Sequence, residues 1–361
     1  MAVKSKKILL ITSEFPPLPG GIGNHAYLLS KYLKQSNYEI SILTDYRSIM
    51  EDDSFDSKLE FKITRIKRNI FTYLNRIIKS FYLVKRNEII INSGKFSLWI
   101  GAILTLFYKS KKFIAVLHGS EIKAGNRYLQ YLTRWSLLQY DDLIAVSNFT
   151  KDYALTVHPK LKIKVINNGI VIDSIVEERT FNKEINLVTV GNVTYRKGQQ
   201  NVINALPLLK QYFPMIHYHC VGISTEQNTF EKLARELNVE HDVTFHGKLD
   251  DIDKDHILKK ATVFIMLSDI IKNDFEGFGI AILEANYLGL PAIGSDNSGI
   301  TDAIKNNFSG RLVNPHKPEE VLDAVKIILD SYPDFSRNAK EWAKQFDWEN
   351  VVKEYVKIID E

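Results

Sequence analysis

Short hydrophobic runs recur along the chain, and the segments between several of them carry hydrophobic residues every three or four positions. Such runs are typical of strands in a parallel sheet that is buried on both faces, and the longer spacing is typical of amphipathic helices. Helices are predicted over 25–35 and 99–108. The predicted strands are 6–12, 38–44, 88–93, 113–119, 142–147, 186–191, 217–222, 242–247, 263–268 and 291–296.

The alternation of strands and helices stops once and then begins again. After a run at 164–173 comes a polar stretch, 174–184, without a clear period. We therefore predict an α/β protein of two Rossmann-like domains, residues 1–178 and 179–341, that face one another across a cleft. The last segment, 342–361, is predicted to form a helix that returns to pack on the first domain.

Length and composition agree with this organisation. The 361 residues, 45% hydrophobic and 25% charged, suffice for roughly two domains of about 150 residues. The single cysteine, Cys220, excludes an intramolecular disulfide and a zinc site built on several thiolates. The uncharged stretch 96–108 is shorter than the ~20 residues that a membrane-spanning helix needs, and the first hydrophobic run lacks a signal-peptide cleavage site. We therefore expect a cytoplasmic protein.

The net charge of +4 is distributed unevenly. Residues 58–112 hold 13 Lys or Arg and two acidic residues, a local charge of +11, whereas the rest of the chain holds 34 basic and 41 acidic residues, a charge of −7. Such asymmetry predicts that this segment meets an anionic partner, namely phosphate groups, a membrane surface or nucleic acid. A solvated basic face is the alternative.

A helix predicted inside this basic segment, 69–86, combines a hydrophobic stripe with basic residues on or beside it, namely Arg76, Lys79, Lys85 and Arg86. A basic, aromatic-rich amphipathic helix suits an anionic bilayer surface. We therefore predict peripheral attachment to the inner face of the membrane, with a core helix whose cations face water as the alternative. The aromatic residues follow the helical spacing, which argues against base stacking and so against nucleic acid as a partner.

Three segments at predicted strand ends carry residues that suit a phosphate-bearing ligand. The first opens a helix, and its Gly20 and Gly21 let a ligand approach backbone N–H groups, although GxGxxG and GK[ST] spacings are both absent. The second, 191–198, places the adjacent cations Arg196 and Lys197 at a strand-to-helix turn, where they suit a diphosphate. A tight turn and a solvated surface loop are the alternative interpretations.

The third segment runs from Glu276 to Glu284 and places two carboxylates eight residues apart around a Gly-x-Gly turn. If the segment is helical, eight residues rise roughly 12 Å. That exceeds the ~5 Å between the two carboxylates of a retaining glycosidase. Two carboxylates at this separation could accept hydrogen bonds from hydroxyl groups at opposite ends of a long polar ligand such as a nucleotide sugar.

In order and spacing, these motifs resemble family 4 of the retaining GT-B glycosyltransferases. The resemblance covers nearly the whole chain and rests on the Gly20–Gly23 loop, His118-Gly119, the Arg196–Gly198 turn, the Glu276/Glu284 pair, and segments 289–291 and 299–302. It implies a GT-B fold and transfer of a hexosyl residue from a nucleotide-diphosphate sugar, GDP-mannose or a UDP-sugar. The implied acceptor is a glycan or a lipid-linked sugar in cell-surface polysaccharide or glycolipid synthesis, and the implied reaction retains anomeric configuration without a metal or other cofactor.

The resemblance also implies roles for individual residues. Glu284 would bind the nucleotide ribose, Lys197 would neutralise the diphosphate, and Glu276 would hold the donor sugar. His118 would lie at the reacting face of that sugar. The residues predicted to be catalytic are His118, Lys197 and Glu276, and those predicted to bind the donor are Gly20, Gly21, Asn192, Arg196, Lys197, Gly277, Phe278, Gly279, Ile280 and Glu284.

Asn192 departs from the family pattern, because many members carry Arg at that position. Either Arg196 supplies the missing cation, or the chain is a catalytically weakened relative that binds nucleotide sugars. A Rossmann-type dinucleotide-dependent oxidoreductase is a further alternative, which the absence of a GxGxxG motif disfavours.

Two other patterns are interpreted as structural. Asp251 and Asp253 mimic a metal-binding motif but lie in a polar segment before a helix, where capping and solvation explain them. His217 and His219 share one face of a strand, and the sequence offers no third metal ligand beside them.

Overall fold

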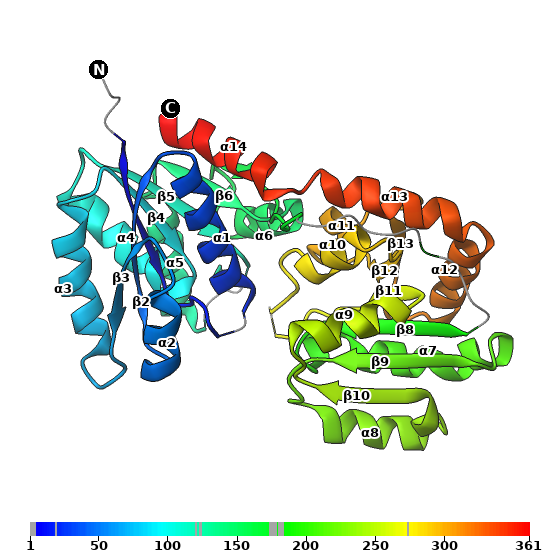
Figure 1. Cartoon of the computed structure of the whole chain (residues 1–361). Coiled ribbons are helices and arrows are strands. Elements are labelled where there is room, and N and C mark those ends of the chain that lie inside the picture. Colours follow the sequence, from blue (N-terminus) through cyan, green and yellow to red (C-terminus); the bar gives the residue numbers. More distant parts are fainter. Residues whose placement is uncertain are drawn as a thin grey trace. The chain divides into compact units, whose positions relative to one another are not determined.

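The computed structural model describes residues 5–18, 20–119, 121–122, 125–172, 179, 184–272 and 274–361. It divides into two units, Met1–Gly169 with Trp348–Glu361, and Ile170–Asp347 (Figure 1). The predicted first boundary, residue 178, lies outside the described residues, and the second unit ends at Asp347 where the sequence suggested residue 341. Each unit is a parallel sheet with helices packed on it, so the prediction of two Rossmann-like α/β units is confirmed.

The first unit is built on a seven-stranded parallel sheet. Its strands are β1 (Lys7–Thr12), β2 (Glu39–Asp45), β3 (Lys62–Ile66), β4 (Ile89–Ser93), β5 (Lys112–Leu117), β6 (Asp142–Ala145) and β7 (Ile163–Val165). Its helices are α1 (Gly21–Gln35), α2 (Ile49–Asp56), α3 (Thr72–Val84), α4 (Lys95–Phe107), α5 (Arg127–Leu137), α6 (Asn148–Val157) and α14 (Trp348–Asp360). The strand order is β3-β2-β1-β4-β5-β6-β7, so the order reverses between β1 and β4. Ligands of open α/β sheets bind beyond the carboxyl ends of the strands at such a point.

The second unit repeats this arrangement with six parallel strands. They are β8 (Ile185–Val190), β9 (Ile216–Val221), β10 (Val243–Gly247), β11 (Val263–Met266), β12 (Ala292–Ser295) and β13 (Gly310–Val313). The helices are α7 (Gln199–Tyr212), α8 (Gln227–Glu236), α9 (Asp251–Lys260), α10 (Ile280–Tyr287), α11 (Ile300–Ala303), α12 (Pro318–Asp330) and α13 (Tyr332–Lys344), with short 3₁₀ turns η1 (Tyr195–Lys197) and η2 (Glu240–Asp242). The order β10-β9-β8-β11-β12-β13 places the reversal between β8 and β11.

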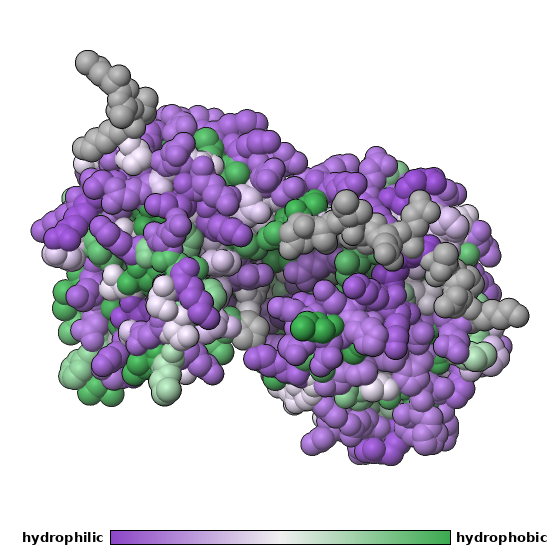
Figure 2. All heavy atoms as spheres, in the orientation of Figure 1, coloured by the Kyte–Doolittle hydropathy of each residue, from purple (hydrophilic) through white to green (hydrophobic). Residues whose placement is uncertain are grey.

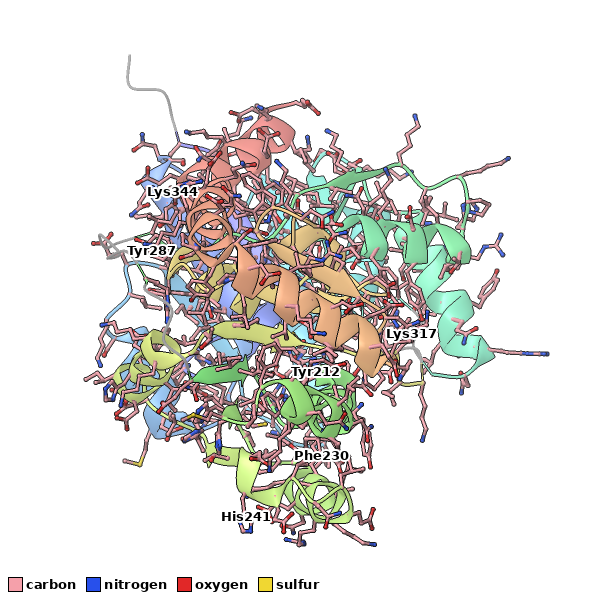
Figure 3. All side chains as sticks on the ribbon, turned by 90° about the vertical axis from the view of Figure 1, so that its right-hand side faces the viewer. Tyr212, Phe230, His241, Tyr287, Lys317 and Lys344 are labelled. Carbon is pink, nitrogen blue, oxygen red and sulfur yellow. The ribbon has the colours of Figure 1, made fainter. Side chains whose placement is uncertain are left out.

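Burial explains which strands the sequence revealed. All five residues of β4 and all four of β11 are buried, as a strand covered on both faces requires. The edge strands β3, β7 and β13 were not among the predicted strands, because they read KITRI, IKV and GRLV, short runs that contain Lys or Arg and are only partly buried. Large side chains fill the space between the sheet of the second unit and its helices; Phe230 of α8, labelled in Figure 3, is fully buried there.

The predicted C-terminal helix is two helices. The single helix expected over 342–359 is interrupted between α13 and α14, where the backbone N–H of Ile170 donates to the carbonyl of Phe346 at 2.8 Å. α13 ends at Lys344 and α14 begins at Trp348, and the two helices belong to different units. As predicted, the last helix, α14, packs on the first unit: its Trp348 stacks on Tyr32 of α1 with ring centroids 5.9 Å apart.

None of the helices within the described residues is both long and apolar enough to cross a membrane.

Candidate functional site

The turn after β8 carries two adjacent cations, Arg196 and Lys197, in the 3₁₀ turn η1. The side chain of Thr194 caps this turn by accepting from the backbone N–H of Lys197. Gly198 then adopts a left-handed conformation, φ +82°, and begins α7. A Cβ atom on Gly198 would lie only 1.7 Å from the carbonyl oxygen of Leu267, so glycine is required for the turn to meet the end of β11. The turn therefore holds both cations at the reversal between β8 and β11.

Both cations contact one carboxylate oxygen. Lys197 Nζ lies 2.8 Å from Glu276 Oε2, and an Arg196 guanidinium nitrogen lies 2.5 Å from the same atom. Arg196 Nε also lies 3.3 Å from a carboxylate oxygen of Asp274. Burial acts to raise the pKa of Glu276, but Lys197 and Arg196 outweigh it and hold that pKa below its usual value. Glu276 is thus ionised and acts as the internal counter-ion of the two cations.

The segment that carries Glu276 is anchored by backbone contacts. The N–H of Gly299 donates to the carbonyl of Glu276 at 2.9 Å, and a Cβ on Gly299 would lie 2.1 Å from the carbonyl oxygen of Gly277. Phe278 is buried, with its ring 5.9 Å from that of Phe346. Gly279, φ +94°, then precedes the first residue of α10. This anchoring fixes the helix start, whose N–H groups suit an anionic or hydroxyl-bearing ligand.

Three buried serines lie within hydrogen-bonding distance of one another at the ends of β11 and β12. Ser268, just after β11, lies 2.8 Å from the hydroxyl of Ser295 and 3.0 Å from that of Ser298, oxygen to oxygen. All three are fully buried. They tie the ends of β11 and β12 to the segment that begins α11, and the sequence analysis did not find them because isolated serines have no distinctive spacing.

Glu284 lies on α10 and is exposed. The pKa of its carboxyl is raised, mainly because surrounding protein atoms displace water from it. The positive charge of Lys254 on α9 lowers this pKa, and the negative charges of Asp251 and Asp255 raise it further. Only residues from Ile280 onward are helical, so the separation that assumed a helix from Glu276 to Glu284 does not apply. The two carboxylates instead come from a loop and from the helix that follows it.

In the first unit, His118 follows β5 and its ring is held on two sides. Its Nε2 lies 3.0 Å from the hydroxyl of Ser93, and its ring packs edge-on against His25 of α1 at 5.0 Å between centroids. His25 Nε2 in turn lies 3.0 Å from the hydroxyl of Tyr355 on α14. Burial lowers the pKa of His118 to about 4, so the imidazole is neutral near pH 7. A neutral ring can donate or accept a hydrogen bond without bringing charge.

The glycine segment at the start of α1 has two kinds of position. A Cβ on Gly23 would lie 3.2 Å from backbone atoms of Glu14 and Phe15, so Gly23 serves packing. A Cβ on Gly21 would meet nothing within 4 Å among the described residues, so the first turn of α1 is open there. Gly20 precedes the helix with extended backbone, next to the carboxylate of Glu14.

Two family models match the chain and together span most of it. "Glycosyl transferases group 1" matches residues 172–346, and "Glycosyltransferase Family 4" matches residues 19–174. The chain belongs to this glycosyltransferase family. The resemblance found in the sequence is therefore confirmed.

Individual glycosyltransferases are similar over nearly the full length. An uncharacterized glycosyltransferase of Methanocaldococcus jannaschii is 25% identical, over 98% of this chain and 97% of its own. The GDP-mannose-dependent alpha-(1-6)-phosphatidylinositol monomannoside mannosyltransferase of Mycobacterium tuberculosis is 23% identical, over 96% of each chain. The structure of Anabaena HepE with UDP and glucose superposes with a TM-score of 0.80 at 17% identity, covering 98% of this chain and 99% of that one. The GT-B fold is confirmed by this likeness.

In this glycosyltransferase, the predicted site residues fall into two groups. Arg196, Lys197 and Glu276 are in direct contact, whereas Asn192 has an exposed side chain at the start of the same turn. Gly277, Phe278, Gly279, Ile280 and Glu284 follow Glu276 in the loop and helix that carry it, and Gly20, Gly21 and His118 belong to the first unit. Besides the serines, sequence reasoning missed Asp274, Lys254, His25, Ser93 and Tyr355.

The two patterns interpreted as structural have ordinary partners. Asp250 caps α9 by accepting from the N–H of Asp253, so Asp251 and Asp253 lie in the first turn of the helix and not before it, and Asp251 pairs with Lys254 at 2.7 Å. His219 lies 3.0 Å from His246, nitrogen to nitrogen. Across the ranges that the structure describes, no group of three or more His, Cys, Asp or Glu residues is arranged to hold a metal ion.

The turn at Gly198 gives a prediction on stability. Gly198→Ala should lower the thermal unfolding temperature much more than Gly247→Ala. Both glycines have positive φ, so alanine at either position costs about 1–2 kcal/mol of backbone strain. Only at Gly198 does the added Cβ also collide with a carbonyl oxygen, since a Cβ on Gly247 meets nothing within 4 Å in the described part of the chain. Equal losses in the two variants would contradict the close approach of this turn to β11.

Proposed function

We propose that this glycosyltransferase moves a hexosyl residue from a nucleoside-diphosphate sugar to a hydroxyl of a glycan or lipid-linked acceptor, with retention of anomeric configuration and without a metal. The observation that carries the proposal is the contact of Lys197 and Arg196 with Glu276 at the start of α10. Two cations that share one internal counter-ion can exchange it for the two phosphates of a donor. The UDP in the Anabaena structure and the GDP-mannose named for the mycobacterial relative both support a donor of this class.

The chemistry follows from these groups. The bond between the anomeric carbon and the diphosphate oxygen breaks, and negative charge develops on the leaving diphosphate. Lys197, Arg196 and the N–H groups at the start of α10 stabilise this charge. A bond forms between the anomeric carbon and the acceptor oxygen on the same face, and a leaving phosphate oxygen takes the acceptor proton. Displaced from the cations, Glu276 can accept a hydrogen bond from a hydroxyl of the donor sugar.

Two further residues, one from each unit, are proposed to contact the donor. Glu284 presents its carboxylate on α10 and would accept hydrogen bonds from the ribose hydroxyls. His118, neutral near pH 7 and oriented by Ser93, would hydrogen-bond the transferred sugar without placing a second positive charge beside the leaving group. We propose that Arg196 supplies the cation that Asn192 does not.

A thermal-shift screen tests this function against its alternatives. UDP or GDP should raise the unfolding temperature, and the corresponding nucleotide sugar should then release nucleoside diphosphate when acceptor is present. A rise with NADH and none with either nucleoside diphosphate would favour the oxidoreductase. Binding without turnover on any UDP- or GDP-hexose would favour a catalytically weakened relative.

We propose that the acceptor is presented at a membrane, on the evidence of α3. Its Ile77, Phe81 and Val84 pack toward the core of the first unit, as the hydrophobic stripe predicts. A second set of hydrophobic side chains on and beside this helix stays exposed, and Figure 2 shows hydrophobic residues gathered over it. These are Ile70, Phe71, Tyr73, Leu74, Ile78 and Tyr82, and they are called the α3 surface below. Exposed cations lie beside it at Lys79, Lys85 and Arg86.

The assignment of one residue, Arg76, to this membrane contact was wrong. Arg76 was predicted on or beside the exposed stripe, but it is buried, and its guanidinium pairs with Asp45 of β2. Its partner explains the difference, since a buried carboxylate needs a counter-ion and Arg76 supplies one to Asp45. Arg76 therefore belongs to the interior of the unit.

The α3 surface predicts binding to anionic vesicles. Phosphatidylcholine vesicles that contain phosphatidylglycerol should sediment the protein at low salt and release it at high salt, because each cation near such a surface contributes about 1 kcal/mol. Leu74→Ser with Ile78→Ser should abolish sedimentation. The matched control is Ile252→Ser, which changes an exposed isoleucine on α9 of the other unit. A wild-type protein that stays in the supernatant at every salt concentration would show that the acceptor is not presented this way.

A further inference from the structure

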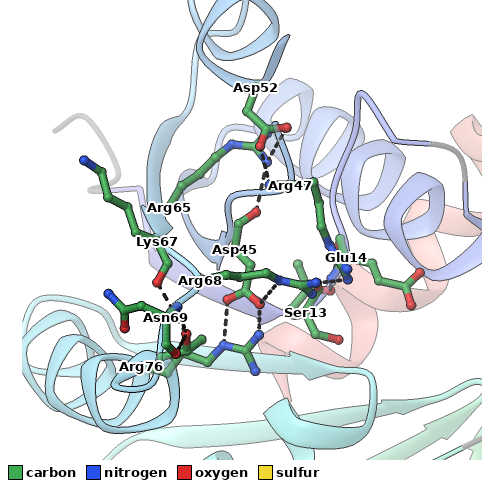
Figure 4. A network of polar contacts seen from close by, with 12 residues as sticks. Ser13, Glu14, Asp45, Arg47, Asp52, Arg65, Lys67, Arg68, Asn69 and Arg76 are labelled. Atoms are coloured by element: carbon green, nitrogen blue, oxygen red, sulfur yellow. Dashed lines mark hydrogen bonds and ion pairs between the residues drawn. The ribbon is translucent and has the colours of Figure 1, made fainter. Parts of the chain in front are cut away.

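A charged network lies at the carboxyl ends of β1, β2 and β3 (Figure 4), and its Glu14 lies next to Gly20, one of the residues predicted to bind the donor. Its buried members pair with one another. Arg65 makes two hydrogen bonds of 2.8 Å to the carboxylate of Asp56 and lies 3.2 Å from Asp52. Arg76 donates to Asp45 at 2.6 Å. These pairs neutralise the interior of the network.

Two arginines at its surface, Arg47 and Arg68, have longer polar contacts than the buried arginines. Arg47, in the loop after β2, is exposed; its backbone N–H donates to Asp52 at 2.7 Å, whereas its guanidinium donates a long bond, 3.4 Å, to the carbonyl of Ser13. Arg68, after β3, is exposed and lies 3.4 Å from Asp45, whose carboxylate Arg76 already occupies. The carboxylates of the network therefore pair the exposed Arg47 and Arg68 less closely than the buried Arg65 and Arg76.

These two arginines also repel one another. Figure 4 shows them extending toward the same place, above Ser13, from two different loops. Partial burial lowers the pKa of Arg47, repulsion by Arg68 lowers it further, and Glu14 and Asp52 offset only part of this. Two like charges held close, each on a loop fixed by buried ion pairs, are stabilised when an anion lies between them.

We propose that Arg47 and Arg68 bind a phosphate group of the acceptor. This inference rests on the proposed function and specifies the chemical class of the second substrate, the acceptor. Paired guanidinium groups match the oxygens of a phosphate, and the carboxyl edge of a parallel sheet is where such a ligand binds. Asn69 and Ile70 follow Arg68 directly and lead into the α3 surface. The phosphate is that of a membrane lipid headgroup or of a soluble phosphorylated sugar, and the two sources share this chemistry.

The test compares two double variants of the full chain. Arg47→Gln/Arg68→Gln removes the pair, and Lys62→Gln/Lys67→Gln removes the same charge from exposed lysines of the same region. Both leave the buried Arg65 and Arg76 in place, and equal unfolding temperatures confirm that the fold is retained. The probes are sn-glycerol 3-phosphate, followed by calorimetry, and phosphatidylcholine vesicles with and without phosphatidylglycerol, followed by sedimentation.

The arginine variant should lose at least tenfold in affinity for one of these probes, and the lysine variant should lose much less. Loss confined to glycerol phosphate assigns the site to a soluble phosphorylated acceptor, and loss confined to vesicles assigns it to a lipid. Equal losses in both variants, or a wild-type protein that binds neither probe, would overturn the inference.

Nucleoside diphosphate binding separates this inference from the proposed function. UDP and GDP should bind the arginine variant as tightly as the wild type. A fall in their affinity equal to the fall for glycerol phosphate would place the pair in the donor site and overturn the acceptor assignment. If the wild type binds neither UDP nor GDP, the proposed function fails, whereas the result with glycerol phosphate still decides whether Arg47 and Arg68 form a phosphate site.

Discussion

Replacing Lys197 with Gln should lower kcat/KM for the nucleotide-sugar donor by roughly tenfold to a hundredfold, since a hydrogen bond to a charged group contributes about 1.5–3 kcal/mol. Lys197 is largely shielded from solvent and lies 2.8 Å from the carboxylate that we expect the diphosphate to replace. Arg196→Gln should have a smaller effect. Arg196 is more exposed than Lys197 and divides its contacts between Glu276 and Asp274.

The control for this result is Lys210→Gln. Lys210 lies in the same unit on α7 and pairs with Asp242 at 2.6 Å, so its loss removes one cation and one ion pair away from the proposed site. Steady-state kinetics of the three variants, with circular dichroism to confirm folding, would decide whether Lys197 and Arg196 hold the diphosphate. Near-wild-type kcat/KM in Lys197→Gln, or an equal loss in Lys210→Gln, would mean that the turn after β8 does not hold the diphosphate.

His118→Ala should lower kcat far more than it raises the KM of the donor. The imidazole is oriented by Ser93 and by the ring of His25, and we expect it to contact the sugar where the bond breaks rather than the nucleotide. An interaction made mainly in the transition state lowers kcat when it is lost. A rise in KM with kcat unchanged would make His118 a ground-state binding residue only.

The pH dependence of His118 gives an independent check. Burial lowers its pKa to about 4 from the ordinary 6.5, so folding favours the neutral ring. The stability that this provides is complete above about pH 6.5 and is lost as the pH falls toward 4. A nuclear magnetic resonance titration should therefore show His118 unprotonated down to pH 5. Titration of His118 with a pKa near 6.5 would mean that its ring is not buried as described.

The sequence predicted the fold best where strands are covered by helices on both faces. The central strands β1, β4 and β11 were predicted because each is an unbroken hydrophobic run. The edge strands β3, β7 and β13 were not, because a strand with one neighbour tolerates cations and needs less burial. The break between α13 and α14 was also missed, although Asp347, a residue type favoured at helix N-termini, directly precedes α14.

The sequence predicted which motifs belong to the candidate site, but it did not predict the contacts between their side chains. The sequence placed Arg196, Lys197 and Glu276 at strand ends, and parallel topology brings such ends together. It could not show that the two cations share one oxygen of Glu276, or that Arg76 turns inward to Asp45. Partners of this kind lie tens of residues apart, so only the folded chain reveals them.

The central claim is that Lys197 and Arg196 hold the diphosphate of a nucleotide donor in place of Glu276. Calorimetric titration of UDP and GDP into wild type, Lys197→Gln and Glu276→Gln tests it most directly. Lys197→Gln should bind the preferred nucleoside diphosphate at least tenfold more weakly, because a cation is lost. Glu276→Gln should bind it as tightly as wild type or more tightly, because the internal counter-ion is gone, while its sugar transfer falls. Unchanged affinity in Lys197→Gln, or equal weakening in both variants, would contradict the account.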